Sequence, residues 1–311
     1  MWLYLANPTS HAGGAIDCSR NYRICVLMKP SPFDYYAPKT IGEAVGLLNG
    51  DDAMVLAGGQ SLVPAMNLRL ASPTALVDIN RISGFDRVTR RDDGVELGML
   101  VRHADLESPP FDDALARLLG RVARYVGHLP IRVRGTFVGS LAHADPAAEW
   151  CAVAAALDAV VVAASHRGER EIAASEFFAG PFTTALEHNE IATAVRFPLL
   201  GRAGVGFSEV SRTAGDFATV AAVAALWTEG ESIARARIAL AGVGGVPVRA
   251  HRAEEILAGS DATETSLDAA AEAAAEGLDP VSEPYCSADF RRHLARVMVA
   301  RSLRSALEDA T

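Results

Sequence analysis

The 311-residue chain has few cysteines, and none is spaced for metal or disulfide chemistry. Four are present, Cys18, Cys25, Cys151 and Cys286, and no two form a Cys-x-x-Cys pair. We therefore expect no iron–sulfur cluster or structural zinc on this chain, and no metal site. A disulfide scaffold is equally unexpected in so long a chain. The scarcity of cysteine favours a reducing, cytoplasmic setting, with peripheral association with the inner face of the membrane as a further option.

Long apolar runs and basic stripes are also missing. A spanning helix needs about 20 apolar residues, whereas the best runs are residues 151–157 with 160–164, and 217–227. We interpret these as buried helices or strands. The chain carries 29 basic and 38 acidic residues, a net charge of −9, which argues against nucleic-acid binding. Half the residues are apolar, as in globular proteins, and the length predicts about two domains.

Familiar catalytic and nucleotide-binding motifs are absent as well. No Gly-x-Gly-x-x-Gly follows a predicted strand, because Pro247 occupies the sixth position after Gly242-Val243-Gly244. Walker A, Gly-x-Ser-x-Gly and His-Glu-x-x-His sequences do not occur. His103-Ala104-Asp105 and His143-Ala144-Asp145 resemble short metal-ligand pairs, but no further ligands accompany them. We interpret His143 as a hydrogen-bonding group, and Asp145-Pro146 as the start of a helix.

Strands and helices follow each other without strict βαβ alternation, which predicts an α+β fold. Residues 1–27 lack a periodic pattern, and we expect a disordered extension or an upstream start codon. Thr40 and Glu43 form a capping box that predicts a helix through Leu48. Strands are predicted at 53–57, 75–79, 94–99, 160–164, 191–197, 206–210, 217–227 and 234–241, and helices at 112–126, 147–157, 247–257, 267–275 and 288–307. We expect a polar loop at 127–146 and a domain boundary near 201–204.

Two glycine-bearing segments are the candidate binding elements. The first, Val55-Leu56-Ala57-Gly58-Gly59-Gln60-Ser61-Leu62, directly follows a predicted strand. The second, Thr136-Phe137-Val138-Gly139-Ser140, has the same mixture of small residues and hydroxyls. Glycines let backbone N–H groups approach an anion, and the hydroxyls add donors. The two segments therefore predict a clamp on one pyrophosphate, although each by itself is more often a simple turn.

Several segments together resemble one family, the FAD-binding medium subunits of molybdenum hydroxylases of the carbon monoxide dehydrogenase and xanthine dehydrogenase type. The segments occur in the family's order and span residues 28–307. They include both glycine-bearing segments, Ile131–Glu149 and Arg212-Thr213-Ala214-Gly215-Asp216-Phe217-Ala218. Leu76–Arg81, Arg102–Leu106, Phe177–Thr184 and Ala239–Gly244 match as well.

The resemblance implies a two-lobed, vanillyl-alcohol-oxidase-type (PCMH-type) FAD-binding domain at 28–203, with lobes at about 28–82 and 83–203. An α+β C-terminal flavoprotein domain follows at 204–308. FAD would be bound noncovalently, with its pyrophosphate at the two glycine-bearing segments. Glu149 would contact ribityl or ribose hydroxyls, and Asp216 and Phe217 would approach the isoalloxazine ring. The molybdenum cofactor and 2Fe–2S clusters would belong to a large and a small partner subunit, in a dimer of heterotrimers.

One position departs from the family's pattern. The second segment usually reads Thr-Ile-Gly-Gly, and here Val138 replaces a glycine. A left-handed backbone at a β-branched residue would cost roughly 1–2 kcal/mol and weaken FAD binding, whereas an extended backbone would cost little.

From the resemblance we predict an electron-transfer subunit without catalytic residues of its own. The alternatives are a structural subunit that has lost its flavin and a free-standing FAD oxidoreductase. The substrate, electron acceptor and stoichiometry are not encoded in recognisable motifs.

Overall fold

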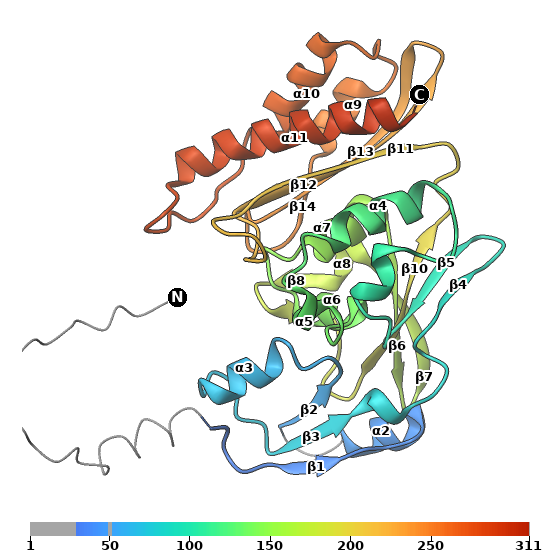
Figure 1. Ribbon diagram of the computed structural model, residues 1–311, viewed down its shortest axis with the longest axis vertical. Coiled ribbons are helices and arrows are strands. Elements are labelled where there is room, and N and C mark those ends of the chain that lie inside the picture. Colours follow the sequence, from blue (N-terminus) through green and yellow to red (C-terminus); the bar gives the residue numbers. More distant parts are fainter. Residues whose placement is uncertain (1–28, 49–51, 311) are drawn as a thin grey trace, which may run out of the picture.

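The computed structural model describes residues 29–48 and 52–310, so the expected extension 1–27 lies outside the described residues. At the N-terminal end of this part, a parallel sheet in the order β1-β3-β2 forms the first lobe (Figure 1). Its strands are β1 (Asp34–Tyr36), β2 (Ala53–Leu56) and β3 (Ala75–Asp78), with helices α2 (Ile41–Leu47) and α3 (Leu62–Asn67) and the 3₁₀ helix η1 (Ile79–Arg81). The predicted cap at Thr40 is present: its hydroxyl accepts from Glu43 N–H, while the Glu43 carboxylate accepts from Lys39 N–H, one residue before the N-cap, instead of from Thr40 N–H.

The second lobe is an antiparallel sheet in the order β4-β5-β10-β6-β7, covered by helices. The strands are β4 (Val88–Arg90), β5 (Gly94–Gly98), β6 (Val160–Ser165), β7 (Gly168–Ala173) and β10 (Ile191–Pro198). The helices are η2 (Ala104–Glu107), α4 (Ala114–Ala123), α5 (Leu129–Arg132), α6 (Phe137–His143), α7 (Glu149–Ala156) and α8 (Ala174–Phe177), beside the hairpin β8 (Phe178–Gly180) and β9 (Thr183–Thr184).

The C-terminal part is an antiparallel sheet, β11-β12-β13-β14, that lies between two helical layers (Figure 1). Its strands are β11 (Gly204–Val210), β12 (Val220–Glu229), β13 (Ser232–Ala241) and β14 (Val248–Arg249). Helices α9 (His251–Leu257), α10 (Glu264–Ala275) and α11 (Ala288–Ala310) cover one face, and α4 and α7 of the second lobe cover the other.

Burial on both faces explains why β12 reads as an almost continuous apolar run. Ala221, Val223 and Ala225 belong to the core shared with the second lobe. Val220, Ala222, Ala224 and Leu226 belong to the core beneath α9–α11. Strand side chains alternate between faces, so a sheet with two covered faces needs apolar residues at every position. The predicted α+β content is thus confirmed.

Several local predictions were wrong. The stretch predicted as a polar loop at 127–146 contains α5 and α6, so the second glycine-bearing segment is the first turn of a helix. Asp145 caps no helix: α7 begins at Glu149, and Asp145 accepts from the Ala147 N–H in a local turn. Val248 and Arg249 pair with β13, so the helix predicted from Pro247 begins only at His251. Among the described residues, no helix combines the length and apolar character needed to cross a membrane.

Candidate functional site

The two glycine-bearing segments, far apart in sequence, lie against each other. Gly58 follows β2, and a Cβ built on it would lie 2.4 Å from the Arg134 carbonyl oxygen and 2.6 Å from the Gly135 Cα. No L side chain fits that distance, so the backbone contact itself requires glycine. A Cβ built on Gly139 would lie 3.8 Å from that of Ala57. The structure therefore joins the predicted elements into one backbone cradle.

The first segment presents its backbone N–H groups. Gly59 has φ +72°, and the side-chain amide of Gln60 donates to the Gly58 carbonyl at 3.1 Å across the turn that leads into α3. In the described part of the chain, the N–H groups of residues 58–61 donate to no backbone carbonyl. Convergent free N–H groups in a turn with a left-handed residue form an anion-binding concavity. Val55 and Leu56 end β2, and Ser61 and Leu62 begin α3, so they hold the turn from either side.

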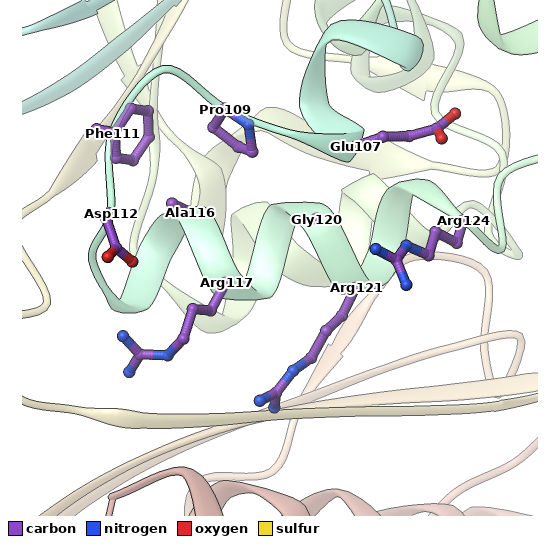
Figure 2. Close-up of a pocket in the computed structure, with 9 residues that line it drawn as sticks. All are labelled: Glu107, Pro109, Phe111, Asp112, Ala116, Arg117, Gly120, Arg121 and Arg124. Atoms are coloured by element: carbon purple, nitrogen blue, oxygen red, sulfur yellow. The ribbon is translucent and has the colours of Figure 1, made fainter.

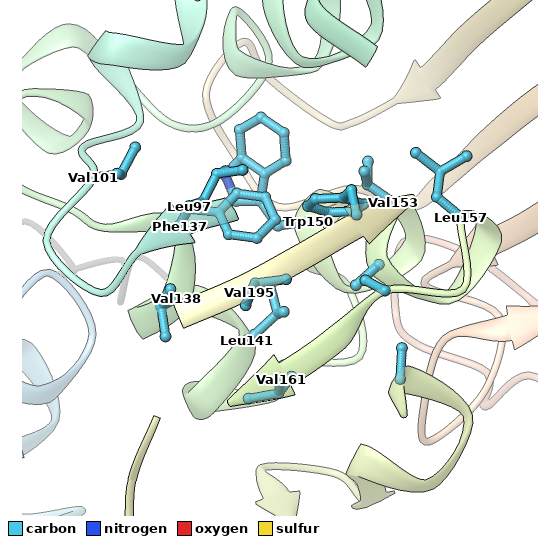
Figure 3. Packing of buried hydrophobic residues seen from close by; sticks show 14 of the residues in the cluster. Leu97, Val101, Phe137, Val138, Leu141, Trp150, Val153, Leu157, Val161 and Val195 are labelled. Atoms are coloured by element: carbon cyan, nitrogen blue, oxygen red, sulfur yellow. The ribbon is translucent and has the colours of Figure 1, made fainter. Parts of the chain in front are cut away.

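The second segment contributes a capped helix start. The Thr136 hydroxyl accepts from Gly139 N–H at 3.1 Å, and Phe137 N–H donates to the Val101 carbonyl at 3.0 Å. Phe137 and Val138 are 0% and 2% exposed and belong to the central core, where Figure 3 shows them near Trp150. Their side chains fill the core and Phe137 N–H is already bonded to Val101, so neither the two side chains nor that N–H group is available to a ligand. Ser140 follows on the same short helix.

Val138 has a helical backbone and lies outside the set of residues with positive φ. Both backbone conformations considered from the sequence, left-handed and extended, are therefore wrong. A helical valine carries no left-handed strain. The backbone strain given as a reason for weakened FAD binding at this position is therefore absent.

Asn80 and Arg102, which were not predicted as site residues, tie the two segments together. The Asn80 amide donates to the Ala57 carbonyl at 2.8 Å. Arg102 donates to the Asn80 side-chain oxygen at 2.6 Å and also to the Arg134 carbonyl. Burial, together with the nearby Arg134 charge, lowers the pKa of Arg102. Both residues lie in segments that matched the family, and that match was the only sequence signal for them.

His103 supports the cradle from inside the protein. The backbone N–H of His103 donates to the Gly135 carbonyl at 3.0 Å. Its ring Nδ1 accepts a hydrogen bond from Trp150 Nε1 at 3.0 Å. Burial, helped by the charges of Arg102 and Arg132, lowers the pKa of His103 to about 4. The ring is therefore neutral at pH 7 and carries its proton on Nε2, because Nδ1 accepts a hydrogen bond. No cluster of three or more potential metal ligands occurs in the described residues.

Glu149 and Glu209 are two carboxyls at the junction with the C-terminal sheet. Glu149 begins α7 and is 3% exposed. Burial raises its pKa to about 7, against a hydrogen bond from its own N–H, and the Asp145 charge adds to the rise. Glu209 lies on β11, where burial and then the Glu149 charge raise its pKa to about 8. Sequence reasoning identified Glu149 but missed Glu209, because only the register of the sheet turns Glu209 toward the second lobe.

Asp216 and Phe217 lie in the connection between β11 and β12. The Thr213 hydroxyl donates to Asp216 at 2.7 Å, and Phe217 is 56% exposed. The connection packs against the second lobe: a Cβ on Gly215, whose φ is +82°, would lie 2.6 Å from the His128 ring. His128 directly precedes α5, so this loop lies over the same lobe as the second glycine-bearing segment.

A cavity of about 400 Å³ lies elsewhere, along α4 (Figure 2), and no predicted site residue lines it. Arg117 and Arg121 extend from α4 at its border, and both donate to Asp309 near the end of α11. Asp309 also accepts from Val205 N–H at 3.0 Å. This group joins the second lobe to the C-terminal part and serves packing between them.

These features define a class of protein: a two-lobed flavin-binding domain followed by a flavoprotein α+β domain. Residues 31–200 match the family described as the FAD-binding domain in molybdopterin dehydrogenase, and residues 206–306 match the carbon monoxide dehydrogenase flavoprotein C-terminal domain. The chain belongs to the family of FAD-binding medium subunits of molybdenum hydroxylases. The predicted PCMH-type fold and the resemblance are both confirmed.

Individual relatives are similar to this chain over nearly its whole length. The chain is 41% identical to the alpha subunit of the 6-hydroxypseudooxynicotine dehydrogenase complex of Paenarthrobacter nicotinovorans, over 91% of this chain and 97% of that protein. It is 35% identical to the carbon monoxide dehydrogenase medium chain of Hydrogenophaga pseudoflava, over 90% and 98%. Among solved structures, carbon monoxide dehydrogenase of the same organism superposes with a TM-score of 0.88 at 36% identity, covering 91% of this chain and 100% of that one. Quinoline 2-oxidoreductase of Pseudomonas putida 86 gives 0.86 at 36% identity, covering 91% and 99%.

Proposed function

We propose that this chain binds FAD noncovalently and passes electrons from iron–sulfur clusters on a partner subunit to an external acceptor. The observation that carries the proposal is the backbone contact of Gly58 with Arg134, which places free N–H groups of one segment beside the capped helix start of the other. The pyrophosphate would lie on this cradle, with Glu149 at the hydroxyl-bearing chain and Asp216 and Phe217 toward the ring. FAD, when bound, supplies the redox chemistry, and the chain supplies position and electrostatic environment.

The partners in the proposal are a large molybdopterin subunit and a small 2Fe–2S subunit, in a dimer of heterotrimers. The family supports this assignment, and the isolated Cys151 and Cys286, both buried and unpaired, offer no cluster ligation among the described residues. We place the domain boundary between residues 203 and 204, where β11 begins. A cytoplasmic location stays a prediction from the scarcity of cysteine.

Flavin content tests the proposal directly. The purified protein should show flavin absorbance near one equivalent per chain, and Gly59→Asp should abolish flavin retention by placing a charged side chain at the phosphates. A colourless protein that FAD does not reconstitute would contradict the proposal and favour the structural subunit without flavin. Copurification with a molybdenum subunit and a cysteine-rich subunit separates the electron-transfer role from a free-standing oxidoreductase.

A further inference from the structure

Asn80 connects the end of the first lobe's sheet to the turn that carries the first glycine-bearing segment. Its side-chain nitrogen donates to the Ala57 carbonyl at 2.8 Å and to the Asp78 carboxylate at 2.6 Å, and its side-chain oxygen accepts from Arg102 at 2.6 Å. A rotation that exchanged nitrogen and oxygen would place an NH₂ group against a guanidinium, which only donates. The three partners therefore fix the orientation of this amide, although the residue itself is exposed.

Arg102 continues this connection to the second glycine-bearing segment. One guanidinium nitrogen donates to the Asn80 oxygen and the other donates to the Arg134 carbonyl, the same carbonyl that lies against Gly58. A guanidinium holds its nitrogens in one rigid plane, so it keeps two acceptors from different parts of the chain at a fixed spacing. This Asn80–Arg102 bridge thus links the carbonyls of both segments through side chains, beside the direct backbone contact.

The bridge also places positive charge at the cradle. Arg102 is half-buried and forms no ion pair in the described part of the chain, although Asp105 and Asp78 lie near enough to favour its charged form. The exposed Arg134 side chain makes no hydrogen bond or ion pair among those same residues. Burial first, and then the Arg134 charge, lowers the pKa of Arg102. Neighbouring like charges are stabilised by an anion, and the segment that the bridge holds carries the free N–H groups of residues 58–61.

We propose that Arg102 is a positioning residue that makes the cradle selective for a dinucleotide. A pyrophosphate has two phosphates to hold and needs both glycine-bearing segments at the correct spacing, whereas the single phosphate of flavin mononucleotide (FMN) needs only one segment. Arg102 sets this spacing through Asn80 and the Arg134 carbonyl. Because FAD and FMN each carry about two negative charges on their phosphates, charge alone gives no such preference. The inference rests on the proposed FAD site and adds a specificity-determining residue to it.

Titration calorimetry of the full-length apoprotein with FAD and with FMN, at one pH and ionic strength, tests this role. Wild type should bind FAD at least tenfold more tightly than FMN. Arg102→Lys keeps the charge but loses the planar pair of donors, so FAD binding should weaken at least tenfold and FMN binding less than about threefold. Asn80→Ala should show the same selective loss. Arg90→Lys, in an exposed pair with Asp113 on the same lobe, is the matched control and should bind both ligands as wild type does.

The double variant tests whether the two side chains act as one bridge. Asn80→Ala combined with Arg102→Lys should bind FAD no more than about threefold more weakly than the weaker single variant, because each change already breaks the bridge. A loss equal to the product of the two single losses would show that the side chains act independently, and it would overturn the inference.

The remaining outcomes separate the two claims. If Arg102→Lys weakens FAD and FMN binding equally, or changes neither, the positioning role is overturned while the FAD site stands. A wild type that binds FAD and FMN equally tightly has the same consequence. If wild type binds no FAD, both proposals fall. Should Arg102→Lys fail to fold, judged by circular dichroism, Asn80→Ala decides: a loss confined to FAD supports the inference, and equal or absent losses overturn it.

Discussion

Gly58 and Arg134 touch through their backbones, so closely that a Cβ on Gly58 would lie 2.4 Å from the Arg134 carbonyl oxygen. The contact joins the turn after β2 to the segment that leads into α6. Side chains reinforce it, since Arg102 donates both to the Arg134 carbonyl and to Asn80, which in turn holds the Ala57 carbonyl. The geometry of the cradle therefore depends on a backbone distance that only glycine allows.

Gly58→Ala should separate the two segments. The added methyl group meets backbone atoms that cannot rotate away, so we expect a loss of about 1–3 kcal/mol in stability and at least tenfold weaker FAD binding. Calorimetry and thermal unfolding measure both effects. Gly46→Ala in α2, where a Cβ meets nothing within 4 Å, is the control and should be neutral or stabilising by about 0.5–1 kcal/mol. Equal FAD affinity in Gly58→Ala and wild type would show that the contact is not part of the site.

Val138→Gly tests whether the family's missing glycine matters. Because Val138 is helical and buried in the core, its removal should cost about 2–3 kcal/mol from lost packing and from glycine in a helix. FAD binding should not become tighter. Urea unfolding measures the loss of stability. The control is Val133→Gly, at the exposed C-cap of α5, which should cost less than about 1 kcal/mol in that measurement. A tighter FAD complex of Val138→Gly would mean that valine does hinder the cofactor.

His103 should make the protein less stable in mild acid. Its pKa is about 4 in the folded protein and about 6.5 when unfolded, so the unfolded chain binds the extra proton between these values. The contribution of His103 to the free energy of unfolding is fully present above about pH 6.5. It falls by roughly 3 kcal/mol as the pH is lowered toward 4. Glu149 and Glu209, with raised pKa values, act in the opposite direction.

The difference between wild type and His103→Phe isolates the histidine, because the carboxyl contributions cancel in the comparison. The variant should lose about 1–3 kcal/mol at pH 7, since Trp150 Nε1 is left without an acceptor. This gap should shrink as the pH is lowered to about 5 in parallel denaturation curves. A gap that stays constant with pH would show that His103 does not remain neutral in the folded protein.

Asp309→Asn should loosen the junction between α4 and α11. Burial alone would raise the pKa of Asp309, but hydrogen bonds from Arg117 and from Val205 N–H hold it below its usual value. Because both arginines are more than one-third exposed, we expect a loss of only about 1–2 kcal/mol. Asp289→Asn breaks an exposed pair with Arg292 and should change unfolding by less than about 0.5 kcal/mol. If the two variants unfold alike, the Asp309 group does not stabilise the junction.

Local patterns were predictable wherever the sequence carries its own signal. The capping box at Thr40 predicted α2, and apolar spacing predicted α4 and the strands β11, β12 and β13 of the C-terminal sheet, but not β14. The helix at Thr136 was missed, because glycine and hydroxyl residues favour turns in isolation. In the folded protein this helix is stabilised by burial of Phe137, Val138 and Leu141 in the core.

The sequence by itself determined the α+β class, the family and the two segments that carry the glycines, because these are properties of residue order and local spacing. Tertiary structure decided that Gly58 meets Arg134, that Asn80 and Arg102 hold both segments, and that Val138 faces the core. It also brought Glu209 to the same junction as Glu149. These relationships join residues far apart in the chain, and only the packing of the β11–β14 sheet onto the second lobe sets their distances, burial and pKa values.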